Sequence, residues 1–144
     1  MIAMAAFWPR GGPKRIGAGF LGNLKQDNAQ STPKRGGDVT LRIEHRDPEF
    51  VVETTSKGLT TRHALQRYTT DGMESISIGS DGDEFHSKAV WKDEALVFDI
   101  LEIEDGKRLR STEVWSLIEG GRSLKRVRRG EKAGEQTLIY TRTQ

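Results

Sequence analysis

The sequence predicts an all-β protein, a single up-and-down antiparallel β-barrel of about ten strands with a flexible N-terminal arm. Apolar and polar residues alternate with a period of two from Val39 onward, as in half-buried strands. Turn-forming residues separate these segments at roughly the 8–12-residue spacing of sandwiches and barrels. No window shows a sustained helical period. Because a meander of short hairpins has two exposed edges unless it closes, closure into a barrel is expected.

The composition of the chain excludes several classes of function. The 144 residues fit one domain, and the absence of Cys excludes disulfides and thiolate metal sites. No apolar run is long enough to span a bilayer. The net charge of +2 divides unevenly, with +5 in residues 1–37 and −3 in residues 38–144. An acidic body with few aromatic residues predicts no nucleic-acid partner, despite a basic cluster over residues 122–129.

Two regions are expected along the chain. Residues 1–18 form the arm, because Pro9-Arg10 ends a short apolar stretch and Gly11-Gly12-Pro13 follows. The stretch lacks the basic start of a secretory signal, which favours a cytoplasmic location. The arm is either a simple extension or a partner-binding segment. Residues 19–144 form the barrel domain, expected as a monomer or weak homodimer.

The first half of the barrel reads as strands divided by turn signals. Val39, Leu41 and Ile43 share one face, and Asp47-Pro48 ends their strand. Asp71-Gly72 predicts a two-residue hairpin. The faces of the strand at 60–68 cannot be assigned from its mixed pattern. Strands are expected near 20–25, and over 39–44, 50–55, 60–68 and 73–78.

The second half alternates more clearly. Residues 92–95, Asp105-Gly106, residues 119–121 and residues 130–134 are the expected turns. Strands are expected over 85–91, 96–103, 109–117, 122–129 and 136–143.

Hairpin register assigns the faces of these strands. A turn at residues 92–95 places Trp91 opposite Leu96, and a turn at residues 119–121 places Leu117 near Leu124. Side chains on a strand alternate, so the same register puts Trp115 opposite Arg126 and Glu113 opposite Arg128, all facing inward. A slip of one residue would reverse every assignment.

An interior with two arginines and one glutamate has a chemical consequence. Charges inside a barrel are costly unless they are paired or hydrated, so one ion pair leaves one guanidinium for an acidic or polar ligand. Trp115 would stack beside it. Two alternatives stay open: the arginines lie in water at the mouth or outside the barrel, or they form a buried ion pair without function.

The leading hypothesis is therefore non-covalent binding of a small hydrophobic or amphipathic molecule, possibly acidic, in the barrel, without a cofactor. The predicted ligand-binding residues form an apolar wall and an orienting polar set: Phe50, Trp91, Phe98 and Trp115, with Glu113, Arg126, Arg128 and Tyr140.

An enzyme is the alternative hypothesis. A hydrolase or isomerase would use Glu113 as acid or base, with His63 or Tyr140 as its partner. The three His match no metal-ligand spacing, so no metal site is predicted.

Several short motifs resemble those of the calycin group, which comprises lipocalins and intracellular fatty-acid-binding proteins, and more closely those of small bacterial lipocalin-like barrels. The motifs are residues 40–48, 68–72, 91–97, 115–117 and 137–140. The resemblance implies a ligand-holding barrel and names no ligand.

Two departures qualify this resemblance. The lipocalin Gly-x-Trp corresponds to Gly22-Asn23-Leu24, with Leu24 in place of Trp. Fatty-acid-binding proteins end in an Arg-x-Tyr pair that grips the ligand carboxylate. Here Tyr140 matches the Tyr, but Leu138 stands where the Arg would be, so that route to fatty-acid binding is not supported.

Overall fold

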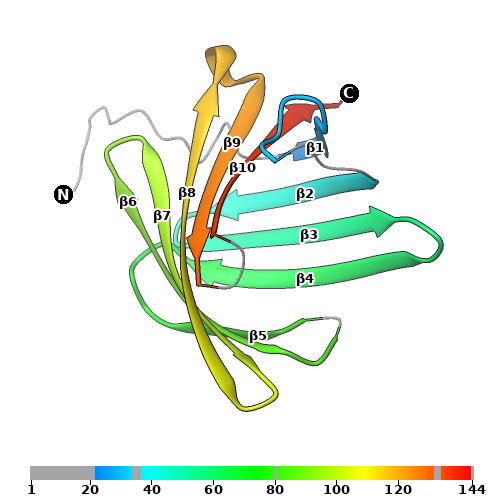
Figure 1. Ribbon diagram of the computed structural model, residues 1–144. Coiled ribbons are helices and arrows are strands. Elements are labelled where there is room, and N and C mark those ends of the chain that lie inside the picture. The colour runs from blue at the N-terminus through cyan, green and yellow to red at the C-terminus, as the bar shows by residue number, and fades with distance from the viewer. Residues whose placement is uncertain (1–21, 34–36, 80, 132–133, 144) are drawn as a thin grey trace.

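A single antiparallel sheet of ten strands curls into a nearly closed barrel in the computed structural model (Figure 1). The structure describes residues 22–33, 37–79, 81–131 and 134–143, so the predicted arm at residues 1–18 lies outside the described residues. The strands are β1 (Gly22–Gln26), β2 (Asp38–Arg46), β3 (Glu49–Lys57), β4 (Thr61–Thr69), β5 (Ser75–Ile78), β6 (Glu84–Lys92), β7 (Ala95–Glu104), β8 (Lys107–Ile118), β9 (Ser123–Gly130) and β10 (Gly134–Arg142).

Helical structure is minimal. A single 3₁₀ turn over Glu119–Gly121 joins β8 to β9 in the described part of the chain. None of the described residues forms a helix long and apolar enough to cross a membrane. The all-β, up-and-down barrel prediction is confirmed.

Neighbouring strands in the sheet are consecutive in the chain, except that β1 lies beside β10. The order is β4-β3-β2-β1-β10-β9-β8-β7-β6-β5, so β1 pairs with both β2 and β10 and joins the two halves. The strands β4 and β5 contact each other without a backbone ladder. The predicted hairpin at Asp71-Gly72 is therefore wrong. Asp71 instead bridges to Val90 of β6, and Gly72 donates its N–H to the Ala89 carbonyl oxygen at 2.9 Å.

The other two-residue turn signal behaves as expected. Asp105 and Gly106 have φ of 49° and 79° and connect the paired ends of β7 and β8. Two consecutive positive φ angles suit a type I′ turn, which matches the twist of a hairpin. The turn fixes the register of the two longest strands.

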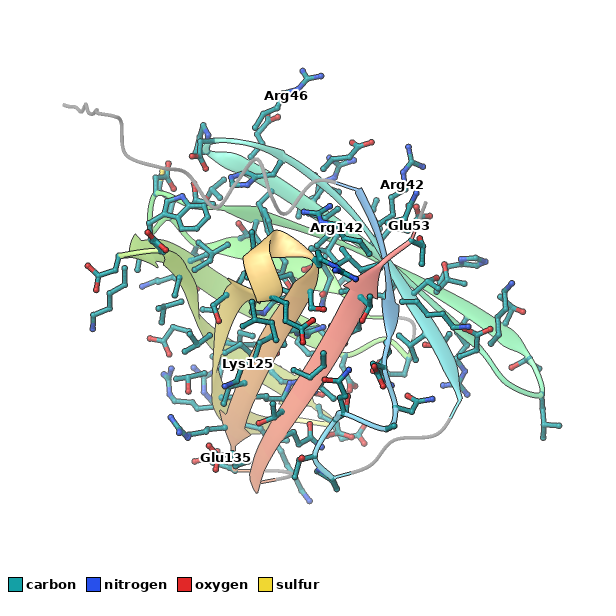
Figure 2. All side chains as sticks on the ribbon, turned by 90° about the horizontal axis from the view of Figure 1, so that it is seen from above. Arg42, Arg46, Glu53, Lys125, Glu135 and Arg142 are labelled. Atoms are coloured by element: carbon teal, nitrogen blue, oxygen red, sulfur yellow. The ribbon has the colours of Figure 1, made fainter. Side chains whose placement is uncertain are left out.

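Alternation separates a charged exterior from an apolar interior. Arg42, Arg46 and Glu53 project outward from β2 and β3 (Figure 2). The residues that alternate with Arg42 and Arg46 on β2 are buried, namely Leu41, Ile43 and His45. Leu24, where a lipocalin has Trp, is 1% exposed and packs in the same core.

Aromatic rings fill one end of the barrel. Phe50 lies at the centre of this aromatic cluster, with ring centroids 5.6 Å from Trp115 and 6.1 Å from both Tyr68 and Phe98. His45 stacks on Trp91 at 5.5 Å and meets Phe50 edge-on. The cluster closes this end, so free space inside the barrel lies beyond Tyr68.

Asp47 ties the closed end together. Its Oδ1 accepts hydrogen bonds from Thr70 Oγ1 at 3.0 Å and Trp91 Nε1 at 3.3 Å, and it also contacts His45 Nε2. Burial alone would raise the pKa of Asp47. The hydrogen bond and charge of His45, together with the hydrogen bonds from Thr70 and Trp91, outweigh burial and lower this pKa to about 2. Three segments are thereby joined at one carboxylate.

Candidate functional site

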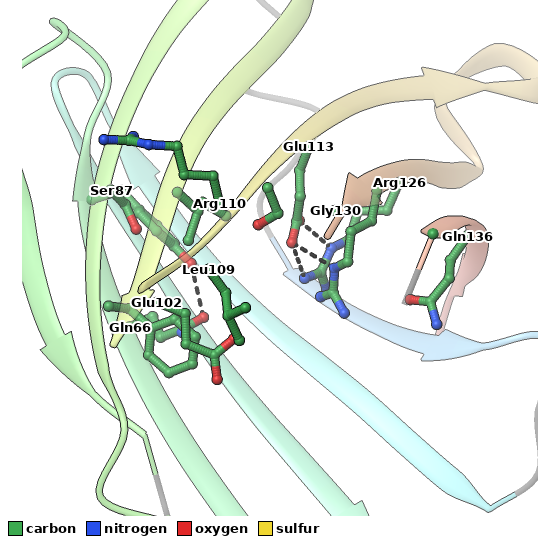
Figure 3. Close-up of a pocket in the computed structure, with 15 residues that line it drawn as sticks. Gln66, Ser87, Glu102, Leu109, Arg110, Glu113, Arg126, Gly130 and Gln136 are labelled. Carbon is green, nitrogen blue, oxygen red and sulfur yellow. Dashed lines mark hydrogen bonds and ion pairs between the residues drawn. The ribbon is translucent and has the colours of Figure 1, made fainter. Parts of the chain in front are cut away.

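A cavity of about 370 Å³ occupies the barrel interior beyond the aromatic cluster (Figure 3). This volume is at the lower end of the range for small-molecule sites. Tyr68 marks the boundary, because it both lines the cavity and contacts Phe50 and Phe98. The polar residues of the lining are Gln66, Tyr68, Ser87, Glu102, Arg110, Ser111, Glu113, Arg126, Arg128 and Gln136.

The predicted register of β8 and β9 is confirmed. Glu113 pairs with Arg128, and Trp115 pairs with Arg126 across the ladder. All four are on the inward face, where Glu113 is 4% exposed. Two successive inward positions of β9 therefore place both guanidinium groups beside one carboxylate.

The carboxylate of Glu113 accepts four hydrogen bonds. Its Oε1 accepts from Trp115 Nε1 at 2.8 Å and from Arg126 Nε at 2.9 Å. Its Oε2 accepts from Arg128 Nε at 2.8 Å and from Arg126 at 3.3 Å. Glu113 consequently orients both guanidinium groups.

Electrostatics keep this cluster ionised. Burial by itself would raise the pKa of Glu113, but the charges of Arg126 and Arg128 and hydrogen bonds from Arg126 and Trp115 lower it to about 2. The same pairing acts on Arg126. Burial by itself would lower the pKa of Arg126, but the charge of Glu113 outweighs burial, so the pKa of Arg126 is raised. Two cations and one anion leave the cluster with one net positive charge.

Arg126 is locked in place. It is 11% exposed, and its Cζ lies 4.6 Å from the Trp115 ring centroid. One terminal nitrogen also donates to the Tyr140 hydroxyl at 3.2 Å. Tyr140 thus acts on the cavity through Arg126.

Arg128 is the more available of the two cations. Its side chain is 36% exposed, and its Nε donates to Glu113. No other described residue accepts a hydrogen bond from its terminal nitrogens. Those donors are chemically suited to an anion at the cavity wall.

The predicted ligand-binding residues divide between two places. Glu113, Arg126 and Arg128 line the cavity. The predicted apolar wall of Phe50, Trp91, Phe98 and Trp115 lies in the aromatic cluster at the closed end, outside the described cavity lining.

The residues of the proposed acid–base pair are not all together. His63 is exposed on β4 and its Nδ1 lies 3.2 Å from Thr55 Oγ1 on the neighbouring strand. Tyr140 reaches Glu113 only through Arg126. A carboxylate with lowered pKa and four donors holds guanidinium groups well and is a poor proton donor at neutral pH.

Sequence reasoning missed several polar residues of the cavity. Gln66 and Tyr68 come from β4, and the Tyr68 hydroxyl donates to Gln66 Oε1 at 2.8 Å. Gln136 of β10 has a buried Oε1 without a hydrogen-bond partner among the described residues. The pairing of Phe50 with Tyr68 would have revealed the β4 face, but only once the loop length between β3 and β4 was known.

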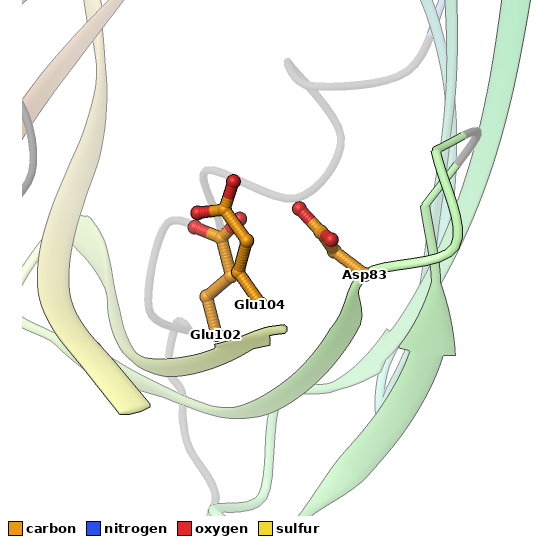
Figure 4. A group of neighbouring side chains, drawn as sticks. All are labelled: Asp83, Glu102 and Glu104. Carbon is orange, nitrogen blue, oxygen red and sulfur yellow. The ribbon is translucent and has the colours of Figure 1, made fainter. Parts of the chain in front are cut away.

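Three carboxylates converge beside the cavity. Oxygens of Asp83, Glu102 and Glu104 lie within 4.8 Å of one another (Figure 4). Partial desolvation, a hydrogen bond with Glu102 and the charges of Asp81 and Glu104 raise the pKa of Asp83 to about 6. This geometry by itself does not define a metal site.

Solved structures of other proteins share this architecture, whereas no family model and no curated protein matches the chain. Secretory abundant heat soluble protein 4 from Ramazzottius varieornatus is 13% identical with a TM-score of 0.70, over 92% of this chain and 100% of that one. The Schistosoma mansoni fatty acid binding protein in complex with arachidonic acid is 13% identical with a TM-score of 0.62, over 89% and 98%. Zebrafish ileal bile acid-binding protein complexed with cholic acid is 13% identical with a TM-score of 0.59, over 85% and 96%.

These likenesses establish the class of fold. The chain forms a calycin-like, ten-strand antiparallel barrel of the kind seen in fatty-acid-binding proteins. At such low identity the likeness shows the fold alone, so function rests on the cavity itself.

Proposed function

We propose that this protein binds a small, partly apolar molecule with an acidic group inside its barrel. The observation that carries the proposal is the orientation of Arg126 and Arg128 by Glu113 at the wall of a 370 Å³ cavity, with one net positive charge. The acid would bind the terminal nitrogens of Arg128. Its apolar part would lie against Ile100, Leu109 and Phe85.

The structural neighbours support a hydrophobic ligand. Two of them are complexes with arachidonic acid and cholic acid, each a carboxylic acid with a large apolar body. The missing Arg of the terminal Arg-x-Tyr pair has a spatial substitute, because Arg126 is the cross-strand partner of Leu138 and bonds to Tyr140. The cation comes from β9 instead of β10.

Replacing Arg128 by glutamine tests this function. We expect octanoate to bind Arg128→Gln at least tenfold more weakly than the parent protein, about 1.4 kcal/mol, because a charge-assisted pair is lost. Arg129→Gln is the matched control, since Arg129 is the next residue, is 68% exposed and pairs with Glu135. Isothermal titration calorimetry measures both.

A neutral ligand completes the test. Octan-1-ol should bind the parent protein and Arg128→Gln equally, because it has no carboxylate. The proposal fails if octanoate does not bind, or if the two arginine variants lose affinity equally.

A further inference from the structure

Four valines lie side by side on the outer surface of the barrel, across β6 to β9. Each is the cross-strand partner of the next: Val90, Val97, Val114 and Val127. Each also lies between two inward-facing residues of its own strand, so all four side chains point outward. Val90 is 44% exposed and the other three are partly exposed. They form an apolar stripe about 14 Å long, or three strand spacings, which we call the valine stripe.

A row of exposed residues runs beside the valine stripe, two positions further along each strand. From β6 to β10, each is the cross-strand partner of the next: Lys88, Asp99, Thr112, Arg129 and Glu135. All five are exposed, and Figure 2 shows Glu135 on the outside of the barrel. The charges therefore alternate on each side of a neutral centre, in the order positive, negative, neutral, positive, negative. We call these residues the charge row.

The charge row is complementary to its own reverse. A two-fold axis parallel to β8 reverses the order of the strands and keeps the position along them, so a second copy presents the same face in reverse. This axis places Lys88 opposite Glu135 of the second copy, and Asp99 opposite Arg129 of the second copy. Arg129 already pairs with Glu135 of its own chain at 2.8 Å, but a guanidinium has five donors and can serve both carboxylates.

The same axis brings the two valine stripes together. Val114 lies on the axis and faces its own copy, and Val97 faces Val127 of the second copy. Contact between the stripes removes apolar surface from water, which favours association. The charge row then fixes the register, because a shift along the interface would bring like charges together.

We infer that the outer face of β6 to β10 is a homodimer interface, on which a second copy of this chain packs about a two-fold axis parallel to β8. Valines are common in strands, so the valine stripe by itself would not identify what covers it. The self-complementary order of the charge row identifies the occupant as a second copy. The inference is independent of the ligand in the barrel.

The interface is expected to be small. The barrel is convex, so the strands on either side of β8 curve away from the second copy (Figure 1). Arg110 is the exposed residue that follows Thr112 toward the other end of β8, and on the axis it would face its own copy. Contact is therefore limited to the valine stripe and the charge row, and small interfaces are weak. At low micromolar concentration the protein is expected to be a monomer.

Sedimentation velocity over a range of protein concentrations tests the interface. The average mass of the parent protein should rise from one chain toward two between about 10 µM and about 1 mM, as for weak complexes. Val114→Glu should weaken association at least tenfold, because it places two carboxylates opposite each other on the axis.

Val51→Glu is the matched control. Val51 also points outward, between Glu44 of β2 and Arg67 of β4, but it lies on β3, far from β8 in the strand order. This variant should associate like the parent protein. Circular dichroism of both valine variants checks that the barrel remains folded.

A mixing experiment tests the two-fold arrangement. Asp99→Arg and Arg129→Asp each place like charges opposite each other in a homodimer, so each variant alone should associate at least tenfold more weakly. In a heterodimer of the two variants, both of these contacts join opposite charges. The mixture should therefore associate within about threefold of the parent protein.

Three results would overturn the inference. A parent protein that stays monomeric up to about 1 mM would exclude a second copy as the occupant. Equal association of Val114→Glu and Val51→Glu would place the interface on another face. A mixture that associates no better than its two components would exclude the two-fold axis.

Discussion

Replacing Glu113 by glutamine is expected to lower the free energy of unfolding by about 3–5 kcal/mol. The neutral amide would leave Arg126 buried beside Trp115 without its counter-charge, and its one remaining acceptor oxygen could not serve the four donors that share the Glu113 carboxylate. Breaking a buried pair from one side is costly because the other charge stays buried. Urea unfolding measures the change.

Glu135→Gln provides the matched control. Glu135 also pairs with an arginine of β9, Arg129, but both side chains are more than half exposed. Exposed pairs contribute about 0–1 kcal/mol, so this variant should unfold near the parent midpoint. Equal stability of Glu113→Gln and the parent would show that the cluster is hydrated and open.

The same residue predicts how stability depends on pH. Folding lowers the pKa of Glu113 from its ordinary value of 4.5 to about 2, so the unfolded chain takes up the proton first on acidification. The stabilisation is complete above about pH 4.5 and is lost as the pH falls toward 2. The free energy of unfolding of Glu113→Gln should therefore fall less steeply on acidification than that of the parent protein. Part of the decrease that remains comes from Asp47, whose pKa is also about 2.

Replacing Phe50 by alanine is expected to cost about 3–5 kcal/mol of stability. Phe50 is fully buried and contacts the rings of His45, Tyr68, Phe98 and Trp115, so its removal leaves a void at the closed end. Thermal and urea unfolding both measure the effect.

Leu59→Ala is the control for Phe50→Ala. Leu59 is also apolar but fully exposed in the loop between β3 and β4, so its removal should change stability by less than about 0.5 kcal/mol. A loss of less than about 1 kcal/mol in Phe50→Ala would contradict the packed aromatic cluster.

Most of the fold and the charged half of the site could be predicted from the sequence. Short turns tie the strands after residue 84 into successive hairpins, so the face of Trp91 determines that of Leu96. A short turn at residues 119–121 likewise sets Glu113 opposite Arg128. Local signals of this kind are strong because one slip would expose the whole apolar face.

The polar half of the cavity could not be predicted for two physical reasons. Three residues, Gly58 to Thr60, separate the paired ends of β3 and β4, and their number is not evident from the sequence. The face of Gln66 and Tyr68 therefore stayed open. β4 and β5 are the two ends of the sheet, and contacts across the barrel bring them together. The residues Asp71-Gly72 therefore do not predict that these two strands are unpaired.

Leu138 illustrates a related limit. A motif search along one strand finds no arginine two residues before Tyr140. The barrel places Arg126 directly across the ladder from Leu138, within hydrogen-bonding distance of the Tyr140 hydroxyl. A guanidinium can thus lie beside the Tyr140 hydroxyl from a neighbouring strand, which only the register reveals.

Nuclear Overhauser contacts between octanoate and isotope-labelled protein test most directly whether the ligand binds inside the barrel. We predict saturable contacts from the octanoate chain to the methyl groups of Ile100 and Leu109, which line the cavity. Ile76 and Ile78, each 59% exposed, should show none. Contacts confined to Ile76 and Ile78 would mean that the acid binds the outer surface, and the interior site would be refuted.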